Sequence, residues 1–333
     1  MNRQSKRMRC VFSILALAVV GSLLLSAVVA QESAPLAKVA FLPHWIPQAQ
    51  FAGYYMAAEK GFYRQHGLDL TVLDGGPRKP VDKALASGEA TFVSHFLSSA
   101  LRLRDNGLAL VHLAQITQRS ALMLVAHKSS GIESVKDLNS KTVSLWPDFS
   151  VQPRALFRKY NLHVRTVTQG PTINLFMRGG VDAASAMWYN EYHLFLNSGV
   201  NEDEMTLIFY DQHGLNFPED GIYCLAETWR AKPDVCRRFV QATLEGWKYA
   251  AGHREEALNI VMQRTDQAHT GTNRAHQHWM LDRMCELIQP VNPATRPGEL
   301  TREAYERVAG ELKNSGEIKS APAFEEFHVP VSP

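Results

Sequence analysis

The sequence lacks the features that mark most metalloproteins and nucleic-acid-binding proteins. It has four cysteines, with no Cys-x-x-Cys pair and no Cys/His spacing suited to zinc. Beyond residue 30 it has no basic run and no segment apolar enough to span a membrane. The GxSxG, HExxH and Walker A sequences are missing as well. These absences argue against the common hydrolase, zinc-protease and P-loop classes, and against nucleic acid as a partner.

The first thirty residues have the composition of an export leader. Residues 1–10 carry four basic side chains and no acid, residues 11–30 are apolar, and the run ends in Val28, Val29 and Ala30. This pattern predicts a signal peptide over 1–30 cleaved after Ala30, with an uncleaved anchor as the alternative. Cys10 precedes the apolar run, so it is not a lipoprotein cysteine. Without the leader, Lys plus Arg falls from 35 to 31 against 33 Asp plus Glu, a formal net charge of −2.

Three cysteines remain after the leader, at Cys224, Cys236 and Cys285. An odd number in an exported chain allows one disulfide at most. Buried free thiols are the alternative, since cysteine is a common core residue. The sequence leaves both open.

Short apolar runs alternate with amphipathic segments from residue 38 onward. The pattern predicts strands over 38–43, 68–74, 90–94, 110–117 and 121–127, and helices over 49–63, 81–86 and 97–107. It then restarts, with helices over 151–162 and 172–180 and strands over 164–169 and 181–188. A repeated βα rhythm favours two α/β lobes, each a mostly parallel sheet with helices on both faces. Residues 229–288 and 301–316 are predicted helical, and 321–333 is predicted to be an irregular tail that packs back on the body.

Several segments between about residues 38 and 288 resemble a known family. They are "WIPQAQFAGYYMAAEKGFYRQHGLDLTVLDGGP", "LASGEATF", "GGVDAASAMWYNE" and the run that starts "FPEDGIYC". They look like the thiamine-pyrimidine-precursor binding proteins, periplasmic receptors of ABC importers akin to those for nitrate, taurine and sulfonates. The fungal thiamine pyrimidine synthase is a further member of this group.

The resemblance implies a two-lobed periplasmic binding protein of type II with two crossover strands as a hinge. Lobe one would take 37–125 plus 222–320, lobe two 126–221, and the tail 321–333. A small ligand would lie between the lobes, where loops and helix N-termini meet at the carboxyl ends of strands. The expected partner is an ABC permease in the inner membrane, the expected state is a monomer in the periplasm, and no cofactor is implied.

Candidate ligand residues of lobe one follow the first predicted strand. Trp45 offers a flat face for stacking, and Gln48 and Gln50 each carry a donor and an acceptor that suit a heterocycle. Tyr54 and His95 are further candidates near the same edge. The alternative for Trp45 and Tyr54 is the core, for the glutamines the solvated surface, and for His95 either.

Candidate ligand residues of lobe two follow the run "AASAM". They are Trp188, Tyr189, Asn190 and Glu191, and a carboxylate beside an aromatic ring can accept the N–H groups of a pyrimidine. In related pyrimidine receptors this motif contacts the ligand. Alternatively, Asn190 caps the next helix and Glu191 lies in its first turn. Trp146 is added as apolar cover for the ligand.

Two departures from the family pattern bear on the chemistry. Where the fungal synthase has a lysine that carries pyridoxal phosphate and a histidine consumed in the reaction, this chain has His95 and Ser99, and a Schiff base needs an amine. The synthase's run of cysteines is represented by Cys224 alone. These departures argue against an enzyme, so we predict no catalytic residues.

The segment "SLWPDF" is the other departure. Relatives often have a turn rich in glycine or serine here, whereas this chain has Asp148 and no glycine, a poor cradle for phosphate. This favours a neutral aromatic ligand over a phosphorylated one. Asp148 or Ser150 as a helix cap, with Pro153 in the first turn, is the alternative.

Three histidines lie close in sequence at positions 269, 276 and 278. His276 and His278 are two apart and therefore on different helix faces, and His278 with Asp282 makes only a partial ligand set. We predict no metal site. The resulting hypothesis is a periplasmic receptor for a small aromatic heterocycle, first a thiamine pyrimidine precursor. A pyrimidine-synthase-like enzyme, an exported sensing module, and a receptor for a flavin or sulfonate are the rivals.

Overall fold

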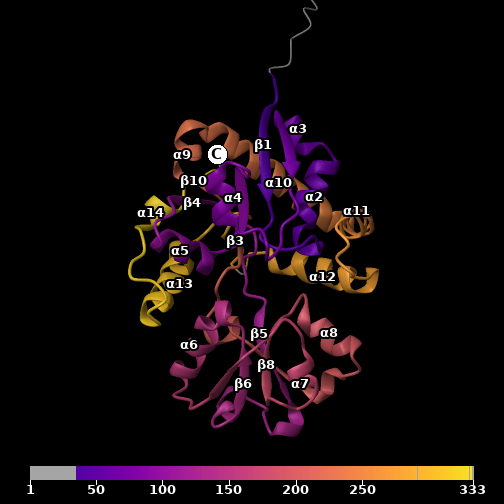
Figure 1. The fold of residues 1–333 in the computed structure, drawn as a ribbon, viewed down its shortest axis with the longest axis vertical. Coiled ribbons are helices and arrows are strands. Elements are labelled where there is room, and N and C mark those ends of the chain that lie inside the picture. The colour runs from indigo at the N-terminus through magenta and orange to yellow at the C-terminus, as the bar shows by residue number, and fades with distance from the viewer. Residues whose placement is uncertain (1–34, 291, 330, 332–333) are drawn as a thin grey trace, which may run out of the picture. The chain divides into compact units, whose positions relative to one another are not determined.

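A computed structural model describes residues 35–290, 292–329 and 331, so the predicted leader over 1–30 lies outside the described residues. Two sheets of five strands each carry helices on their faces (Figure 1). The strand orders are β2-β1-β3-β10-β4 and β7-β6-β8-β5-β9. The predicted two-lobed α/β architecture is therefore confirmed.

The first sheet has four strands in one direction and one reversed strand. Its strands are β1 (Ala37–Leu42), β2 (Leu68–Val72), β3 (Phe92–Phe96), β4 (Leu110–Gln115) and β10 (Asp220–Leu225). Strand β10 runs antiparallel to both β3 and β4, whereas β1 is parallel to β2 and β3. The start of β10 therefore lies beside the carboxyl ends of its neighbours.

The second sheet repeats this plan. Its strands are β5 (Leu122–His127), β6 (Thr142–Leu145), β7 (Arg165–Thr168), β8 (Ala183–Met187) and β9 (Met205–Phe209). Here β5 is the reversed strand, antiparallel to β8 and β9. Each reversed strand is the one that follows a passage of the chain from the other sheet.

Strand residues alternate between two apolar clusters, as period-2 burial requires. In the first sheet Phe41 and Phe92 face one cluster, and Leu42 and Val93 face the other. On the first face lie α2 (Ala52–Glu59), α3 (Phe62–Gln65), α10 (Pro233–Gly252), α11 (Arg254–Gln267) and α12 (Arg274–Leu287). The opposite face carries α4 (Val81–Ser87), α5 (Leu97–Asp105), α13 (Arg302–Asn314) and α14 (Phe324–Phe327), and α9 (Ala226–Ala231) follows β10.

Three helices flank the second sheet. They are α6 (Val151–Lys159) on one face, and α7 (Asn174–Met177) and α8 (Glu191–Asn197) on the other. Met123 and Val125 of β5 pack against Phe176 of α7 and Phe195 of α8. The residues of α8 thus follow directly from the end of β8 and are fixed by this apolar contact.

The predicted continuous helix over 49–63 is wrong. The chain instead forms a 3-10 turn, η1 (Ala49–Phe51), then α2, and begins α3 after a break. Gly61 has φ +71°, a left-handed conformation that glycine adopts without strain and that ends α2. The predicted packing of the tail is confirmed, because Phe327 is fully buried and the Val329 N–H donates to the His112 carbonyl oxygen at 3.0 Å.

Two passages of chain connect the sheets, residues 116–121 and 214–219, and side chains bond one to the other. The Ser120 N–H donates to Asn216 Oδ1 at 2.8 Å, and Asn216 Nδ2 donates back to the Gln118 carbonyl oxygen at 3.1 Å. The Ala121 N–H donates to Glu219 Oε1 at 2.6 Å. The two passages are therefore tied together along their length.

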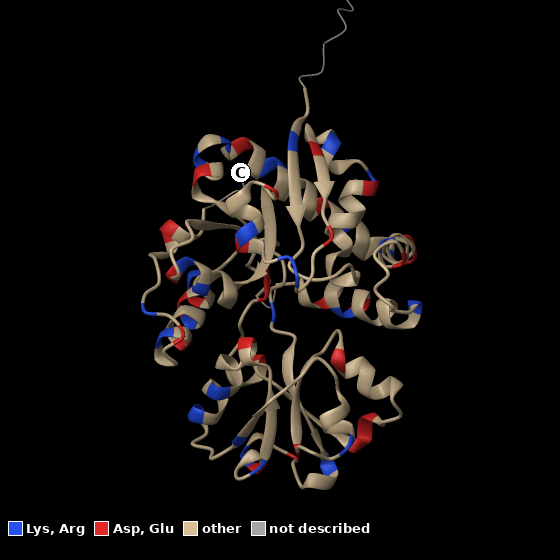
Figure 2. Ribbon diagram, viewed as in Figure 1, with Lys and Arg blue, Asp and Glu red and all other residues tan. Residues whose placement is uncertain are grey.

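Cys224, Cys236 and Cys285 are buried free thiols, so the alternative of free core cysteines holds for these three. Among the described helices, none combines the length and apolar character needed to cross a membrane. No group of three or more His, Cys, Asp or Glu side chains suited to a metal ion occurs in the described part of the chain. Basic and acidic residues are interspersed over the helices of both lobes (Figure 2).

Candidate functional site

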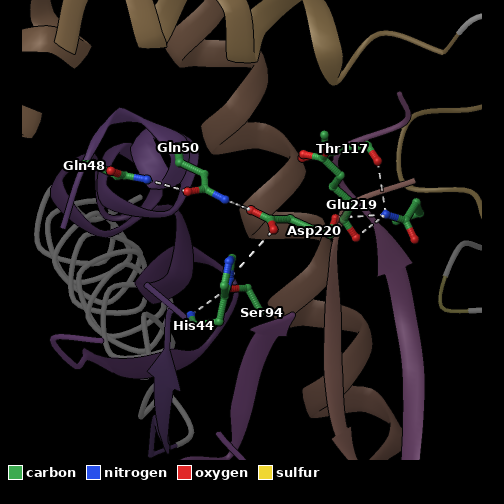
Figure 3. Close-up of polar contacts among 8 residues, drawn as sticks. His44, Gln48, Gln50, Ser94, Thr117, Glu219 and Asp220 are labelled. Carbon is green, nitrogen blue, oxygen red and sulfur yellow. Dashed lines mark hydrogen bonds and ion pairs between the residues drawn. The ribbon is translucent and has the colours of Figure 1, made fainter. Parts of the chain in front are cut away.

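A chain of buried polar side chains lies at the carboxyl edge of the first sheet. Gln48 Nε2 donates to Gln50 Oε1 at 2.5 Å, and Gln50 Nε2 donates to Asp220 Oδ2 at 2.9 Å (Figure 3). Both glutamines are less than a tenth exposed, and Asp220 is 2% exposed. The two predicted glutamines are thus brought together, and they point to an acid at the start of β10.

The second oxygen of Asp220 is unused. Asp220 Oδ1 lies 3.7 Å from His44 Nδ1 and has no hydrogen-bond partner among the described residues. His44 is held from the other side by Ser94, whose Oγ accepts from the His44 N–H at 3.1 Å and lies 3.0 Å from Nδ1. Burial raises the pKa of Asp220 to about 7, and the bond from Gln50 opposes that rise. Asp220 is therefore a buried carboxyl with one free acceptor.

Glu219, the preceding residue, points the other way. Its Oε1 accepts from the Ala121 N–H at 2.6 Å and from the Leu122 N–H at 3.1 Å. Burial, and then the neighbouring charge of Asp220, raises the pKa of Glu219 to about 8. Two adjacent acids thus take separate tasks, because successive strand residues face opposite directions. Glu219 fixes the passage between the sheets, and Asp220 faces the glutamines.

Two histidines beside this acid are neutral. Burial, followed by the charge of His95, holds the pKa of His44 well below its usual value. Burial also lowers the pKa of His95 to about 4, and Nδ1 of His95 has no partner among the described residues. The ring centroids of the two are 5.7 Å apart. The predicted residue His95 thus lies next to the polar chain and adds a neutral ring with one unused nitrogen.

The second-lobe residues form a compact turn between β8 and α8. Glu191 Oε2 accepts from the Met187 N–H at 2.9 Å, and Oε1 accepts from Asn190 Nδ2 at 2.8 Å. Burial raises the pKa of Glu191 to about 6, and these donors oppose the rise. Asn190 occupies the N-cap position of α8 but its side chain makes no capping bond, so the alternative capping role of that side chain is wrong. Its carboxamide serves Glu191 instead.

Tyr189 connects the two halves. It is buried, and burial raises its pKa, with further contributions from the charges of Glu219, Asp220 and Glu191 in that order. Acids of both halves of the site therefore act electrostatically on this one buried phenol.

The remaining predicted residues are more dispersed. Trp45 is 40% exposed, whereas Tyr54 is buried with its ring stacked 4.3 Å from that of Phe41. Trp146 donates Nε1–H to the Gly170 carbonyl oxygen at 3.2 Å. Trp188 is half-buried, and its carbonyl oxygen accepts from Trp279 Nε1 at 3.0 Å. Trp45 thus presents a free face, while Tyr54 packs in the core.

A cavity beside Glu219 is lined by both lobes, and none of the ten predicted residues is among its lining. Phe96, Ser98 and Arg102 line it from the first lobe. The rings of Phe96 and of Phe149, another lining residue, meet edge to face with centroids 5.1 Å apart. It is further lined by Leu122, Asp148, Val151, Gln152, Met187, Phe217, Pro218 and Glu219. The cavity therefore adjoins the polar chain on the side of α5 and α6.

Sequence reasoning missed His44, Ser94, Glu219 and Asp220. The signal that could have found the acids is their position, two carboxylates opening the apolar strand "GIYCL". Buried acids are costly unless they have a task, so an acid pair at a strand's cleft-facing end indicates a site. His44 and Ser94 carry no comparable signal, because each is a common residue at a strand end.

The chemistry of the arrangement is hydrogen-bond recognition. Asp220 and Glu191 present acceptors, and Gln48 and Gln50 present both donors and acceptors. The ion pairs of the described residues include Asp220 only through His44, and none joins Glu191 or Glu219 to a lysine or arginine. Such a site suits a ligand that carries N–H donors and an aromatic face.

Comparison with known proteins supports a common ancestry with binding proteins. The model of the family described as NMT1/THI5 like matches residues 48–257. The riboflavin-binding protein RibY of Chloroflexus aurantiacus is 26% identical over 248 residues, 71% of this chain and 69% of that protein. The formylaminopyrimidine-binding protein of Halalkalibacterium halodurans is 22% identical over 293 residues, 84% of this chain and 86% of that protein.

Four similar proteins are yeast pyrimidine phosphate synthases, and each matches over a shorter region. The 4-amino-5-hydroxymethyl-2-methylpyrimidine phosphate synthase THI12 of Saccharomyces cerevisiae is 23% identical over 127 residues, 38% of this chain and 37% of that enzyme. Among solved structures, the putative periplasmic sulfonate-binding protein SsuA of Methylobacillus flagellatus superposes with a TM-score of 0.68. It is 14% identical and covers 89% of this chain and 92% of that one. The fold is therefore that of the periplasmic binding proteins, as the resemblance implied.

Proposed function

The chain belongs to the NMT1/THI5-like family, and from this premise we propose that it is the solute-binding protein of an ABC import system. It would be exported through the leader over 1–30, act as a monomer in the periplasm, and deliver its ligand to a permease. The lobe built on the first sheet and the lobe built on the second would close around the ligand, with 321–333 as the tail. The ligand would be a small aromatic heterocycle, first a thiamine pyrimidine precursor.

The observation that carries this proposal is the polar chain that ends at Asp220. A buried carboxyl with one oxygen bound to Gln50 and the other unused is a ready acceptor for an N–H group. A 4-aminopyrimidine offers an exocyclic amine next to a ring nitrogen, so it can donate to a carboxyl and accept from a carboxamide. Gln48, Gln50, Asp220 and Glu191 together present that set, and Trp45, Trp146 and Trp188 would cover the ring faces.

The same residues disfavour a sulfonate or a phosphate. Anion sites in proteins gather arginine, lysine or several backbone N–H groups. The groups whose charges act on Tyr189 are carboxyls, which offer no positive charge to an anion and repel it when ionised. We therefore propose that the ligand is neutral or cationic, although the overall fold is shared with sulfonate receptors.

We propose that the protein does no chemistry on its ligand. The place of the synthase's lysine is held by His95, which has no amine with which to form a Schiff base. A pyridoxal adduct absorbs above about 380 nm, where protein aromatic side chains do not absorb. Purified protein should accordingly show no absorbance in that region. Such an absorbance, retained on dialysis and lost on borohydride reduction, would return the enzyme hypothesis.

Calorimetric titration of the mature chain with four probes tests the ligand. The probes are 4-amino-5-hydroxymethyl-2-methylpyrimidine, its formylaminopyrimidine analogue, riboflavin and an alkanesulfonate. We expect the pyrimidines to bind in the micromolar range or tighter, on the order of −8 kcal/mol, and the sulfonate not to bind. A sulfonate that binds while no heterocycle does would refute the proposal.

The matched variants are Asp220→Asn and Asp69→Asn. Asp220→Asn keeps the shape of the side chain but replaces one carboxyl oxygen with an NH2 donor, so affinity should fall at least about tenfold, or roughly 1.4 kcal/mol. Asp69 is exposed on β2 and lies outside both the polar chain and the lining of the cavity beside Glu219, so its variant should bind normally. Equal affinity in both variants would mean that Asp220 does not contact the ligand.

Riboflavin is a second candidate ligand because RibY of Chloroflexus aurantiacus is 26% identical over 71% of this chain. A flavin ring is wider than a pyrimidine and presents one imide N–H between two carbonyl groups. The glutamines could serve those carbonyls, and Asp220 the N–H. Riboflavin binding with no response to either pyrimidine would select this candidate within the same proposed role.

A further inference from the structure

Helix α12 touches both halves of the candidate site with neighbouring residues. The Ala49 N–H, between the two site glutamines, donates to Gln277 Oε1 at 2.7 Å. One residue earlier, His276 Nε2 lies 2.8 Å from Asn190 Oδ1 in the second-lobe half. Both α12 side chains are buried, His276 at 7% and Gln277 at 2% exposure. One turn of helix therefore bonds to the segment 48–50 and to the segment 188–191.

The bond from Gln277 is set by a second contact. Its Nε2 donates to Thr272 Oγ1 at 2.9 Å, which leaves Oε1 pointing at Ala49. Ala49 opens η1, where the N–H has no partner within the turn, so a buried acceptor from outside is needed there. Gln277 supplies it. The position of the glutamine-bearing segment is thus fixed by α12 as well as by β1.

The bond from His276 has a defined donor. Asn190 Oδ1 can only accept, so the proton lies on His276 Nε2. Burial lowers the pKa of His276 to about 4. The other ring nitrogen, Nδ1, lies 2.9 Å from His193 Nδ1, which also contacts Asn197 Nδ2 at 3.1 Å. The bond to Asn190 therefore fixes which nitrogen of His276 donates toward the second half of the site.

The Asn190 carboxamide connects His276 to Glu191. Because Oδ1 is taken by His276, Nδ2 is left to donate to Glu191 Oε1 at 2.8 Å. That bond holds one oxygen of the predicted ligand-binding carboxylate, and the Met187 N–H holds the other. The His276 side chain of α12 thus sets the orientation of the Asn190 carboxamide. In that orientation Nδ2, the donor, points at Glu191.

Aromatic contacts reinforce the junction. Trp279 donates Nε1–H to the Trp188 carbonyl oxygen at 3.0 Å, and its ring stacks on His193 with centroids 5.1 Å apart. The Arg283 guanidinium lies 4.9 Å from the Trp188 ring centroid and 4.6 Å from that of Trp279. Stacking and cation–π contacts of this kind add to the hydrogen bonds.

We propose that α12 sets the two halves of the ligand site in register, with His276 and Gln277 as its positioning residues. Neither need touch the ligand. His276 orients Asn190 and Glu191, and Gln277 orients the segment of Gln48 and Gln50. The ligand-binding consequence rests on the proposed function, whereas the structural consequence does not. In this proposal His276 of α12 acts neither as a metal ligand nor as an ordinary core residue.

Amide hydrogen exchange of the ligand-free protein tests the structural consequence. In His276→Phe we expect exchange of the N–H groups of residues 188–193 to speed up about tenfold, with Ala49 unchanged. In Gln277→Leu we expect the reverse, about tenfold at Ala49 alone. His278→Phe is the matched control, because His278 is exposed on the same helix and makes only a 3.6 Å contact with Asp282.

Titration with 4-amino-5-hydroxymethyl-2-methylpyrimidine tests the functional consequence. His276→Phe should bind about tenfold more weakly, and His276→Gln, whose carboxamide can donate to Asn190, should recover most of that loss. His278→Phe should bind as the wild type does. A purely structural role would lower the unfolding midpoint without the recovery by glutamine.

The outcomes separate the two ideas. If the wild type binds none of the pyrimidine or flavin probes, the proposed ligand fails, and the exchange rates still decide the role of α12. If exchange at residues 188–193 is the same in His276→Phe and His278→Phe, and Ala49 is unaffected by Gln277→Leu, the role of α12 is refuted. Should the phenylalanine variant not fold, His276→Ala against His278→Ala makes the same comparison.

Discussion

The two halves of the site are held in different ways. In the first lobe, Gln50 bonds to Asp220 within the edge of one sheet, and all its partners belong to that lobe. In the second lobe, Asn190 bonds to His276, which belongs to a helix packed on the other sheet. The first half therefore keeps its geometry by itself. The second half takes part of its geometry from the neighbouring lobe, so it is the half that a change in lobe contact would alter.

The largest expected effect comes from removing the Glu219 carboxyl, which bonds the chain at the start of β5 to the first half of the site. Glu219→Ala leaves the buried N–H groups of Ala121 and Leu122 without their acceptor. Each such group costs roughly 1–3 kcal/mol, so we expect a loss of about 3 kcal/mol in the free energy of unfolding. Urea unfolding measures it. Glu219→Gln keeps an acceptor oxygen and should lose less than half as much; an equal loss would show that the charge, not the acceptor, matters.

The next effect is a pH dependence above pH 6.5 that comes mainly from the first half, because the pKa of Glu191 in the second half is raised only to about 6. Burial raises the pKa of Asp220 to about 7 and of Glu219 to about 8, above their unfolded values, so the unfolded chain binds fewer protons than the folded one. Stability is then full at low pH and falls as pH rises. His44 and His95, with lowered pKa values, act in the opposite direction but only below about pH 6.5.

Between pH 6.5 and 8 the free energy of unfolding should therefore fall by an amount on the order of 2 kcal/mol. Urea unfolding at closely spaced pH values measures the slope. In Glu219→Gln and in Asp220→Asn the slope should flatten, since each removes one titrating group. A profile that rises over this range in the wild type would contradict the raised pKa values.

A smaller effect is expected in the second half. Asn190→Ala removes the bonds to His276 and Glu191, which are partly solvated, and should cost about 1 kcal/mol of unfolding free energy. A double-mutant cycle with His276→Phe isolates the shared bond. The double variant should lose little more than the larger single loss, because both remove the same contact. Strictly additive losses would show that the bond contributes nothing.

The smallest effect on stability is expected at Trp45. Its ring is 40% exposed, so Trp45→Ala should change the unfolding free energy by less than about 0.5 kcal/mol. Affinity for the bound probe should nonetheless fall more than about tenfold, because the stacking face is lost. Leu175, 41% exposed, is the matched control, and Leu175→Ala should change neither quantity. Normal affinity in Trp45→Ala would place the ligand away from this ring.

Much of the fold could be predicted because it follows from periodicity. The apolar strand runs, the helical stripes and the restart near residue 134 are local patterns that each lobe repeats. Other features needed long-range information. The break at Gly61 shows no interruption in the apolar spacing, and the reversal of β5 and β10 is a property of chain routing rather than of either strand's composition.

The site was predicted in part for the same reason. Gln48, Gln50 and Glu191 stood out because polar side chains follow strands at the edge where ligands bind. Asp220 was missed because its partner Gln50 is 170 positions away, and no local pattern shows that pairing. His276 did stand out in the sequence, but as a possible metal ligand. Its actual partner, Asn190, is fixed only by how α12 packs on the turn before α8.

The bonds between the two passages of chain have a mechanical consequence. Ser120, Asn216 and Glu219 tie the passages so closely that a change of direction in one must be matched in the other. Two independent connections would let one lobe both swing and twist against the other. Two connections that are hydrogen-bonded to each other leave the lobes mainly one rotation relative to each other. The axis of that rotation is the line that crosses both connections. Any rearrangement of the lobes is thereby steered along a single path, and the second half-site would approach the first with the same orientation on every cycle.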